Sequence, residues 1–344
     1  MRHPAPRLFG RSASADAPLS FPSALPIPAN MDRTPRVLTF VSIFAIALAA
    51  CDASAPEGEV ASGASAAAPS AIGHLTFATQ ADFDRAYKEL LDVSADVAAT
   101  TKSSASFTSM LAAEQADAAA AESGAKADTE VRLRVVEDPY LASLLSPAGV
   151  IQIGKTVYKV GPTKVFTGTE ANLAEFQSKT EAELSTQGTP SVTVERSGDS
   201  APQAFQGDGA AVNLGPFDAR CTTFTGSNGS TYKVCGTSFI TNWSFVRSAG
   251  ATTDVLKRGW FGIYYPVKGD QLTLTSTYQL AYVGQPLPPA QTKTATATRS
   301  WILARIYHYG ASYNGPQLRG SVNSTHRATH ASRTAQSTTA ASKS

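Results

Sequence analysis

The sequence has little of what most catalytic motifs require. Its 344 residues include five histidines and three cysteines. Neither the zinc-protease pattern His-Glu-x-x-His nor the nucleophile-elbow pattern Gly-x-Ser-x-Gly occurs in it. His326 and His330 stand four residues apart, a spacing that suits a metal ion only on a helix, and we expect the end of a strand or coil there. We therefore predict no metal site, no cofactor and no catalytic residue, and leave open whether the chain is an enzyme.

Strong net charge is also lacking. The formal net charge is +2, and removing residues 1–50 takes away five arginines and two aspartates, so the remainder is close to neutral. A nucleic-acid-binding protein needs a strongly basic surface, so we exclude that class. No carboxylate follows Asp270, whereas seven lysines and arginines do. This basic sector either packs against the acidic middle of the chain, is simply solvated, or presents a basic face to envelope glycans or lipid phosphates.

The main uncharged apolar run, residues 37–51, is too short to span a bilayer, which takes about 20 residues. Arg33 and Arg36 precede it, and it ends in the four residues Leu48-Ala49-Ala50-Cys51. Basic, apolar and small-residue regions in this order are typical of an export signal. The segment resembles the bacterial lipoprotein signal peptide. That resemblance implies that Cys51 is lipidated, begins the mature chain and anchors it to a membrane, on the periplasmic or surface face of the cell envelope.

Composition divides the rest of the chain. Residues 1–30 precede a second methionine, Met31, and we interpret them as an extension ahead of the true start or as a disordered leader; residues 31–50 are the signal peptide. Residues 51–72 are rich in Ala, Ser, Gly and Pro and predict a flexible tether. The later segments follow from periodicity and turn residues: helices plus a β-hairpin over 73–186, a linker over 187–219, an antiparallel β-domain over 220–324 and a disordered tail over 325–344.

In the helical part, Thr79 is placed to cap a helix that carries Phe83 and Tyr87 on one face. The pattern predicts further helices over 106–122, 139–146 and 169–184 and a strand over 130–136. Residues 149–156, GVIQIGKT, match the phosphate-loop pattern G-x-x-x-x-G-K-[ST]. The apolar residues before and after Gly154 and Lys155 favour two strands instead, so we predict a hairpin and no nucleotide binding.

The block containing this hairpin, LLSPAGVIQIGKTVYKV over residues 144–160, resembles a segment of uncharacterised bacterial surface lipoproteins. In those proteins a short Leu-Leu helix precedes a hairpin. The resemblance covers this block alone. It supports a surface location and implies nothing about chemistry.

Cys221 and Cys235 form an even pair in a chain that we expect in an oxidising compartment. A clear turn, Gly226-Ser227-Asn228-Gly229, lies between them. We predict a disulfide across a β-hairpin; two free thiols and a pair of metal ligands are the alternatives.

From Arg220 the sequence alternates with a period of two. Strands are predicted over 239–246, 259–265, 272–282 and 292–309, with an edge strand over 317–324 and with 259–265 buried on both faces. Together these predict an α+β protein: a small helical and hairpin region followed by an antiparallel β-sandwich or open barrel.

Aromatic residues are the best binding candidates. Most of them should fill the sandwich core, but Trp243, Trp260 and Trp301 could form a platform for sugar rings or a partner chain if they lie exposed together. We predict a membrane-anchored envelope lipoprotein that serves as a non-catalytic binding or structural module, with an envelope glycan or protein as its partner. The alternatives are a carboxylate-dependent hydrolase, using turn aspartates such as Asp254 and Asp270, and an accessory subunit of a surface assembly.

Overall fold

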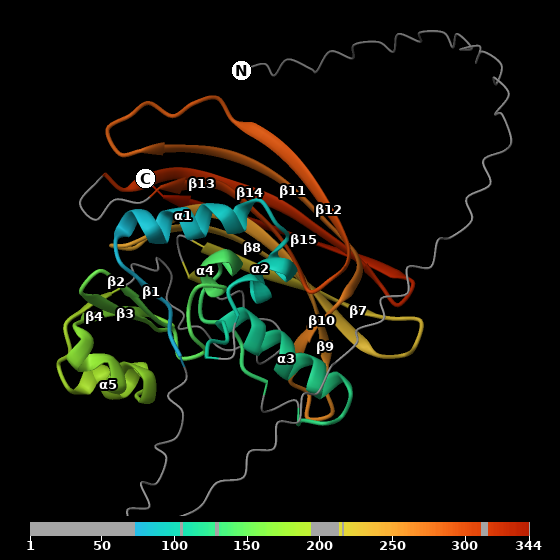
Figure 1. Cartoon of the computed structure of the whole chain (residues 1–344). Coiled ribbons are helices and arrows are strands. Elements are labelled where there is room, and N and C mark those ends of the chain that lie inside the picture. The colour runs from blue at the N-terminus through green and yellow to red at the C-terminus, as the bar shows by residue number, and fades with distance from the viewer. Residues whose placement is uncertain are drawn as a thin grey trace, which may run out of the picture. The chain divides into compact units, whose positions relative to one another are not determined.

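The computed structural model describes residues 73–103, 106–127, 131–193, 213–214, 217–310 and 316–343. The predictions for residues 1–30, 31–50 and 51–72, Cys51 among them, therefore lie outside the described residues. The predicted α+β class is confirmed: a helical region with a small sheet precedes a region of long antiparallel strands (Figure 1).

The first region holds six α-helices and a five-stranded sheet in the order β1-β2-β3-β4-β5. Strand β1 pairs with β2 in parallel and the other neighbours are antiparallel. The bounds of the helices are α1 Gln80–Leu91, α2 Ala95–Thr101, α3 Met110–Glu122, α4 Pro139–Ala142, α5 Leu173–Ser178 and α6 Glu181–Thr186. The bounds of the strands are β1 Thr76–Phe77, β2 Val150–Ile153, β3 Thr156–Val160, β4 Lys164–Gly168 and β5 Ser191–Thr193.

Local sequence accounts for these elements. Thr79 caps α1 by accepting a hydrogen bond from the backbone N–H of Asp82, as predicted. Asp138 caps α4 in the same way, with Pro139 as its first residue. The phosphate-loop look-alike is the hairpin β2–β3, which turns at Gly154 with φ +61°. The segment 131–136 is not a strand, because Arg132 and Arg134 are drawn into ion pairs with helix α3.

The second region is a sandwich of two antiparallel sheets. One has the order β10-β9-β8-β7-β6, with β13 also paired to β9, and the other has the order β12-β11-β14-β15. The bounds are β6 Asn213–Leu214, β7 Phe217–Thr225, β8 Thr231–Asn242, β9 Arg247–Arg258, β10 Tyr264–Val267, β11 Gly269–Tyr282, β12 Gln291–Ser300, β13 Ile302–Gly310, β14 Leu318–His330 and β15 Arg333–Lys343. Leu272 and Leu274 of the second sheet pack against Val234 and Val255 of the first.

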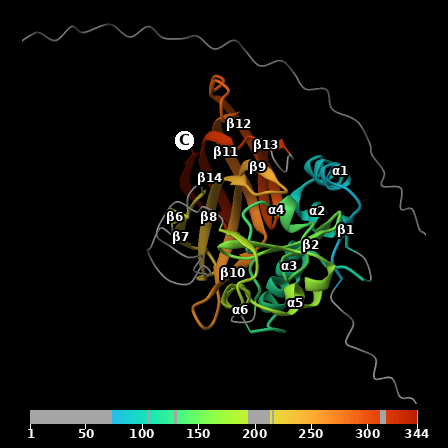
Figure 2. The ribbon, with the colours of Figure 1, turned by 90° about the vertical axis from the view of Figure 1, so that its left-hand side faces the viewer.

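The first sheet of the sandwich is covered on both faces, which is why every residue of β9 from Arg247 to Leu256 is buried. The second sheet covers one face, and the helices cover the other (Figure 2). Phe83 and Tyr87 of α1 belong to one hydrophobic cluster with Phe245 and Ile302 of the β-region. The helical region and the β-region therefore share a core, and the predicted linker 187–219 does not separate two independent ones.

Two further boundaries change. The predicted disordered tail, 325–344, forms the second half of β14 and the whole of β15. The predicted edge strand, 317–324, is the start of β14, which lies inside its sheet between β11 and β15. In the predicted linker, residues 191–193 form β5 and residues 213–214 form β6, while 194–212 lie outside the described residues.

Candidate binding surface

The three candidate tryptophans do not form one platform. Trp243 is 7% exposed and lies in the shared core before β9 begins, whereas Trp260 is 95% exposed and follows the end of β9. A strand of that length separates them by on the order of 40 Å. Trp301 is half-buried between β12 and β13, and its backbone N–H donates to Asp96 of α2. Of the three, Trp260 alone has the exposure that a binding residue needs.

Trp260 and Phe261 occupy the tip of the β9–β10 hairpin. The N–H of Gly262 donates to the carbonyl of Gly259 at 3.1 Å, so the two aromatic residues hold the central positions of a β-turn. Gly262 has φ +83°, a conformation that favours glycine and is typical of the residue after such a turn in a hairpin. Phe261 is 68% exposed. We call residues 259–262 the aromatic turn.

The base of the aromatic turn is well fixed. The N–H of Gly259 donates to the carbonyl of Ile263 at 2.7 Å, and Arg258 pairs with Tyr264 at the first rung of the ladder. Tyr264 and Tyr265 are both buried. The prediction that 259–265 forms one buried strand is therefore correct for Tyr264 and Tyr265, which begin β10, and wrong for residues 259–263. The apolar run gave no sign of the turn, but the two flanking glycines did.

The aromatic turn lies in a basic setting. Residues 255–269 include Lys257, Arg258 and Lys268 and no carboxylate. The Nζ of Lys233, on the neighbouring strand β8, lies 3.9 Å from the centre of the Tyr264 ring. Lys257 and Arg258 therefore directly precede the aromatic turn, whereas Lys268 lies at the far end of the hairpin with its Nζ 5.6 Å from the centre of the Trp301 ring.

The histidine pair cannot act together as a metal site. His326 and His330 lie on strand β14, where four residues span about 13 Å. His326 is fully buried between the two sheets, and burial lowers its pKa to about 3. Among the described residues no group of three or more His, Cys, Asp or Glu side chains is placed to hold a metal ion.

His326 belongs to a buried polar chain that the sequence did not reveal. Its Nδ1 lies 2.9 Å from the hydroxyl of Thr253 and its Nε2 lies 2.7 Å from the hydroxyl of Thr339. Three serines extend the chain from Thr339 at 2.7–3.0 Å: Ser238, Ser324 and Ser276. Many hydrolases use a hydroxyl next to an imidazole as nucleophile and base. Here both sheets cover the hydroxyl groups and the imidazole, so we assign these side chains a structural role.

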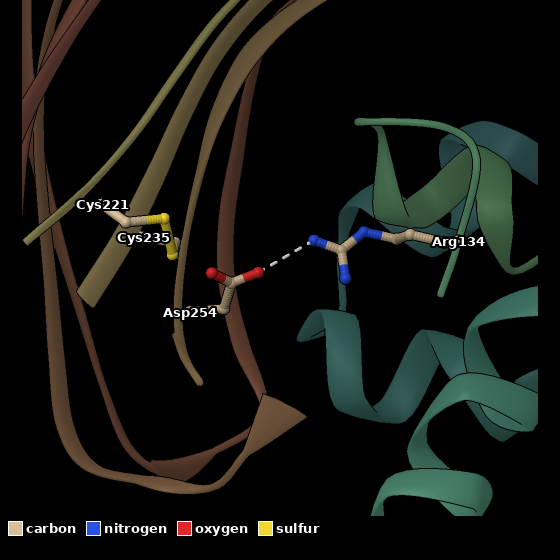
Figure 3. Close-up of a disulfide and its surroundings, with 4 residues drawn as sticks. All are labelled: Arg134, Cys221, Cys235 and Asp254. Atoms are coloured by element: carbon tan, nitrogen blue, oxygen red, sulfur yellow. Dashed lines mark hydrogen bonds and ion pairs between the residues drawn. A yellow bond between two sulfur atoms is a disulfide. The ribbon is translucent and has the colours of Figure 1, made fainter. Parts of the chain in front are cut away.

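The carboxylates named for catalysis do not converge. Asp254 of β9 is buried and accepts from Arg134 at 3.1 Å, as Figure 3 shows. Arg134 also pairs with Glu114 of α3 at 2.8 Å, so the three charges join the helices to the sandwich. Asp270 begins β11 on the surface and accepts from the backbone N–H of Ala331. Each of these aspartates thus has a structural partner.

The predicted disulfide is confirmed. Cys221 and Cys235 are opposite each other in the β7–β8 hairpin and are joined, with their Cα atoms 4.1 Å apart. Cys235 is in turn the ladder partner of Asp254, so the disulfide and the Arg134–Asp254 pair are neighbours on the same sheet (Figure 3). The disulfide fixes β7 to β8, and β8 pairs with β9, one of the two strands that carry the aromatic turn.

No protein-family model matches the chain, and neither the curated proteins nor the solved structures include a significant match. Among the described residues, no helix has the length and apolar character needed to cross a membrane.

Proposed function

We propose that this protein is a lipid-anchored lipoprotein of the cell envelope and acts as a non-catalytic binding module through its aromatic turn. The export signal ending at Cys51 supports the anchor. One observation carries the binding role: Trp260 is 95% exposed at the tip of a hairpin whose base is buried and hydrogen-bonded.

The fold gives no reason for aromatic residues at these positions. The centre of a turn ordinarily holds small or polar residues, because it faces water and needs no apolar side chain. A Trp or Phe side chain can bury up to about 150–250 Å², and moving such a side chain out of water contributes on the order of 2–3 kcal/mol. Two exposed aromatic residues side by side on a well-fixed turn are therefore a source of binding energy for a partner.

The alternatives receive less support from the described residues. A carboxylate-dependent hydrolase needs two carboxylates about 5–9 Å apart on either side of a substrate, and Asp254 is instead neutralised by Arg134. An accessory subunit of a surface assembly would bind an acidic partner through the basic sector, the residues after Asp270. These residues form strands of the sandwich, and Arg327 and Arg333 are exposed on them.

The anchor is tested by growing cells with a palmitate analogue. The expected result is labelling of the wild-type protein and none of a Cys51→Ala variant. Equal labelling of the two would contradict lipidation at this residue.

The binding role is tested with the unlipidated Cys51→Ala chain and isolated envelopes. Envelopes should retain this chain and should lose it when Trp260→Ser and Phe261→Ser are added. A matched control replaces Val283 and Leu287, which are also exposed apolar residues, on the β11–β12 turn, by Ser. Equal loss of retention with the control variant, or no loss with the aromatic variant, would contradict the proposal.

A further inference from the structure

We infer that the aromatic turn is a lipid-contact site, and that its partner is the anionic surface of the membrane to which the chain is tethered. This inference rests on the proposed function, because it names the partner of the same turn. Three observations support it: the chemistry of the tip, the charge next to it and its size.

The tip has the chemistry of a membrane interface. Tryptophan is enriched at the boundary between headgroups and acyl chains, because its ring is apolar and its indole N–H is polar. Trp260 can occupy that boundary while Phe261 enters the apolar layer beneath it. The hairpin already presents both residues to solvent, since they are 95% and 68% exposed.

The charges next to the tip suit anionic headgroups. Lys257 and Arg258 directly precede the aromatic turn, and each residue of this kind near an anionic surface strengthens binding. On α3, the helix that packs against β10, Glu114 and Asp117 are paired with cations and the third carboxylate, Glu122, is exposed. In the described part of the chain neither Lys257 nor Arg258 forms an ion pair with a carboxylate, so both can meet an anionic partner.

The turn lies at the end of the fold where the described chain begins. In Figures 1 and 2 strand β1 starts in the lower part of the molecule, and the β9–β10 turn projects from that same lower end. The β11–β12 turn lies at the upper end in both views. The β11–β12 turn, which carries the control residues, therefore lies at the opposite end of the fold from the aromatic turn.

The size of the tip favours a bilayer over a folded protein. A stable protein interface buries about 800 Å² on each partner, whereas two aromatic side chains supply about 150–250 Å² each. A bilayer needs no complementary surface and accepts a small apolar tip with basic neighbours. The turn would then be a second attachment that orients the domain on the membrane.

The test uses the full chain with Cys51→Ala, so that no acyl chain contributes, and vesicles of phosphatidylethanolamine and phosphatidylglycerol. We expect co-sedimentation that falls about tenfold or more in the Trp260→Ser, Phe261→Ser variant and stays within about twofold in the Val283→Ser, Leu287→Ser control. Pure phosphatidylcholine vesicles should bind more weakly, and binding should weaken as salt rises. Unfolding of each variant is followed in parallel, so that a folding defect is not taken for lost binding.

Tryptophan fluorescence gives a second readout. Trp243 is buried and Trp301 is half-buried against α2, so a blue shift on adding vesicles should come mainly from Trp260. Trp260→Phe should abolish most of the shift while keeping most of the binding. Absence of vesicle binding, or binding that the aromatic variant does not weaken, would overturn the lipid assignment. If delipidated cell-wall material still retained the chain through the aromatic turn, the binding module would stand with a different partner. If neither material depended on the turn, both proposals would fall.

Discussion

The imidazole ring of His326 occupies the space that a side chain at position 236 would need. A Cβ placed on Gly236 would lie 2.0 Å from Cδ2 of that ring. Gly236 is in the middle of β8, opposite Thr253 of β9, which itself contacts the ring. The two sheets of the sandwich are thus fitted to each other at a histidine and a glycine, not at two apolar side chains.

Gly236→Ala is therefore expected to destabilise the protein by about 1–3 kcal/mol, because the ring must move within a close-packed layer. Denaturant unfolding of the wild type and the variant measures the loss. Adding His326→Ala to Gly236→Ala should cost less than the two single changes combined, since the second change removes the clash. Strict additivity of the two effects would show that the ring does not restrict position 236.

A second prediction concerns pH. The folded protein takes up a proton at His326 only near pH 3, whereas the unfolded chain does so near the ordinary value of 6.5. The unfolded state therefore binds more protons between these values, and the free energy of unfolding falls as the pH drops through this window and is flat above it. The contribution is on the order of a few kcal/mol.

Burial also lowers the pKa of His308, so the measurement must separate the two histidines. His326→Gln should remove most of the fall in the free energy of unfolding between pH 6.5 and 3, and His308→Gln should remove less of it. Unfolding curves collected across this range provide the comparison. An unchanged pH profile in His326→Gln would contradict the assignment.

A third prediction concerns the ion pairs between the helices and the sandwich. Arg134→Met leaves Glu114 and Asp254 buried without their shared cation, and we expect a loss of about 3–5 kcal/mol at neutral pH. The loss should shrink at lower pH, where the carboxylates can be protonated. Arg85→Met is the control, because its partner Asp82 is on the surface and such pairs are worth about 0–1 kcal/mol. Equal costs for the two variants would refute a special role for Arg134.

The disulfide provides a fourth prediction. Replacing Cys221 and Cys235 by Ser should lower the free energy of unfolding by about 3 kcal/mol, the value expected for closing a loop of this length. Reduction of the wild type should produce a similar loss, and the double variant should not respond to reductant. If reductant destabilises the double variant as well, the disulfide is not the cause.

Several elements could be predicted because their signals are local. The Thr79 cap, the turn between the two cysteines and the alternation along β11 each depend on residues that are close in sequence. The β2–β3 hairpin could be distinguished from a phosphate loop for the same reason, since strand-forming residues lie on both sides of Gly154.

The predictions are wrong where contacts between residues distant in the sequence determine the local structure. The segment that forms β15 was predicted to be disordered because its inward residues are small and polar. These residues suit the buried polar chain, in which Thr339 is bonded to Ser238. The segment 131–136 looked like a strand because its apolar residues alternate, but its arginines pair with α3. The exposure of Trp260 depends on the hairpin turning one residue before it, and an apolar run contains no such information.

Strand β15, Arg333–Lys343, closes the outer sheet and packs across the sandwich against β7 and β8. Ser337 and Thr339 of this strand are buried at that contact, and Thr339 holds the ring of His326. A chain without β15 would open the buried polar chain to water and uncover β7 and β8. Loss of this one edge strand would therefore disturb both sheets of the sandwich.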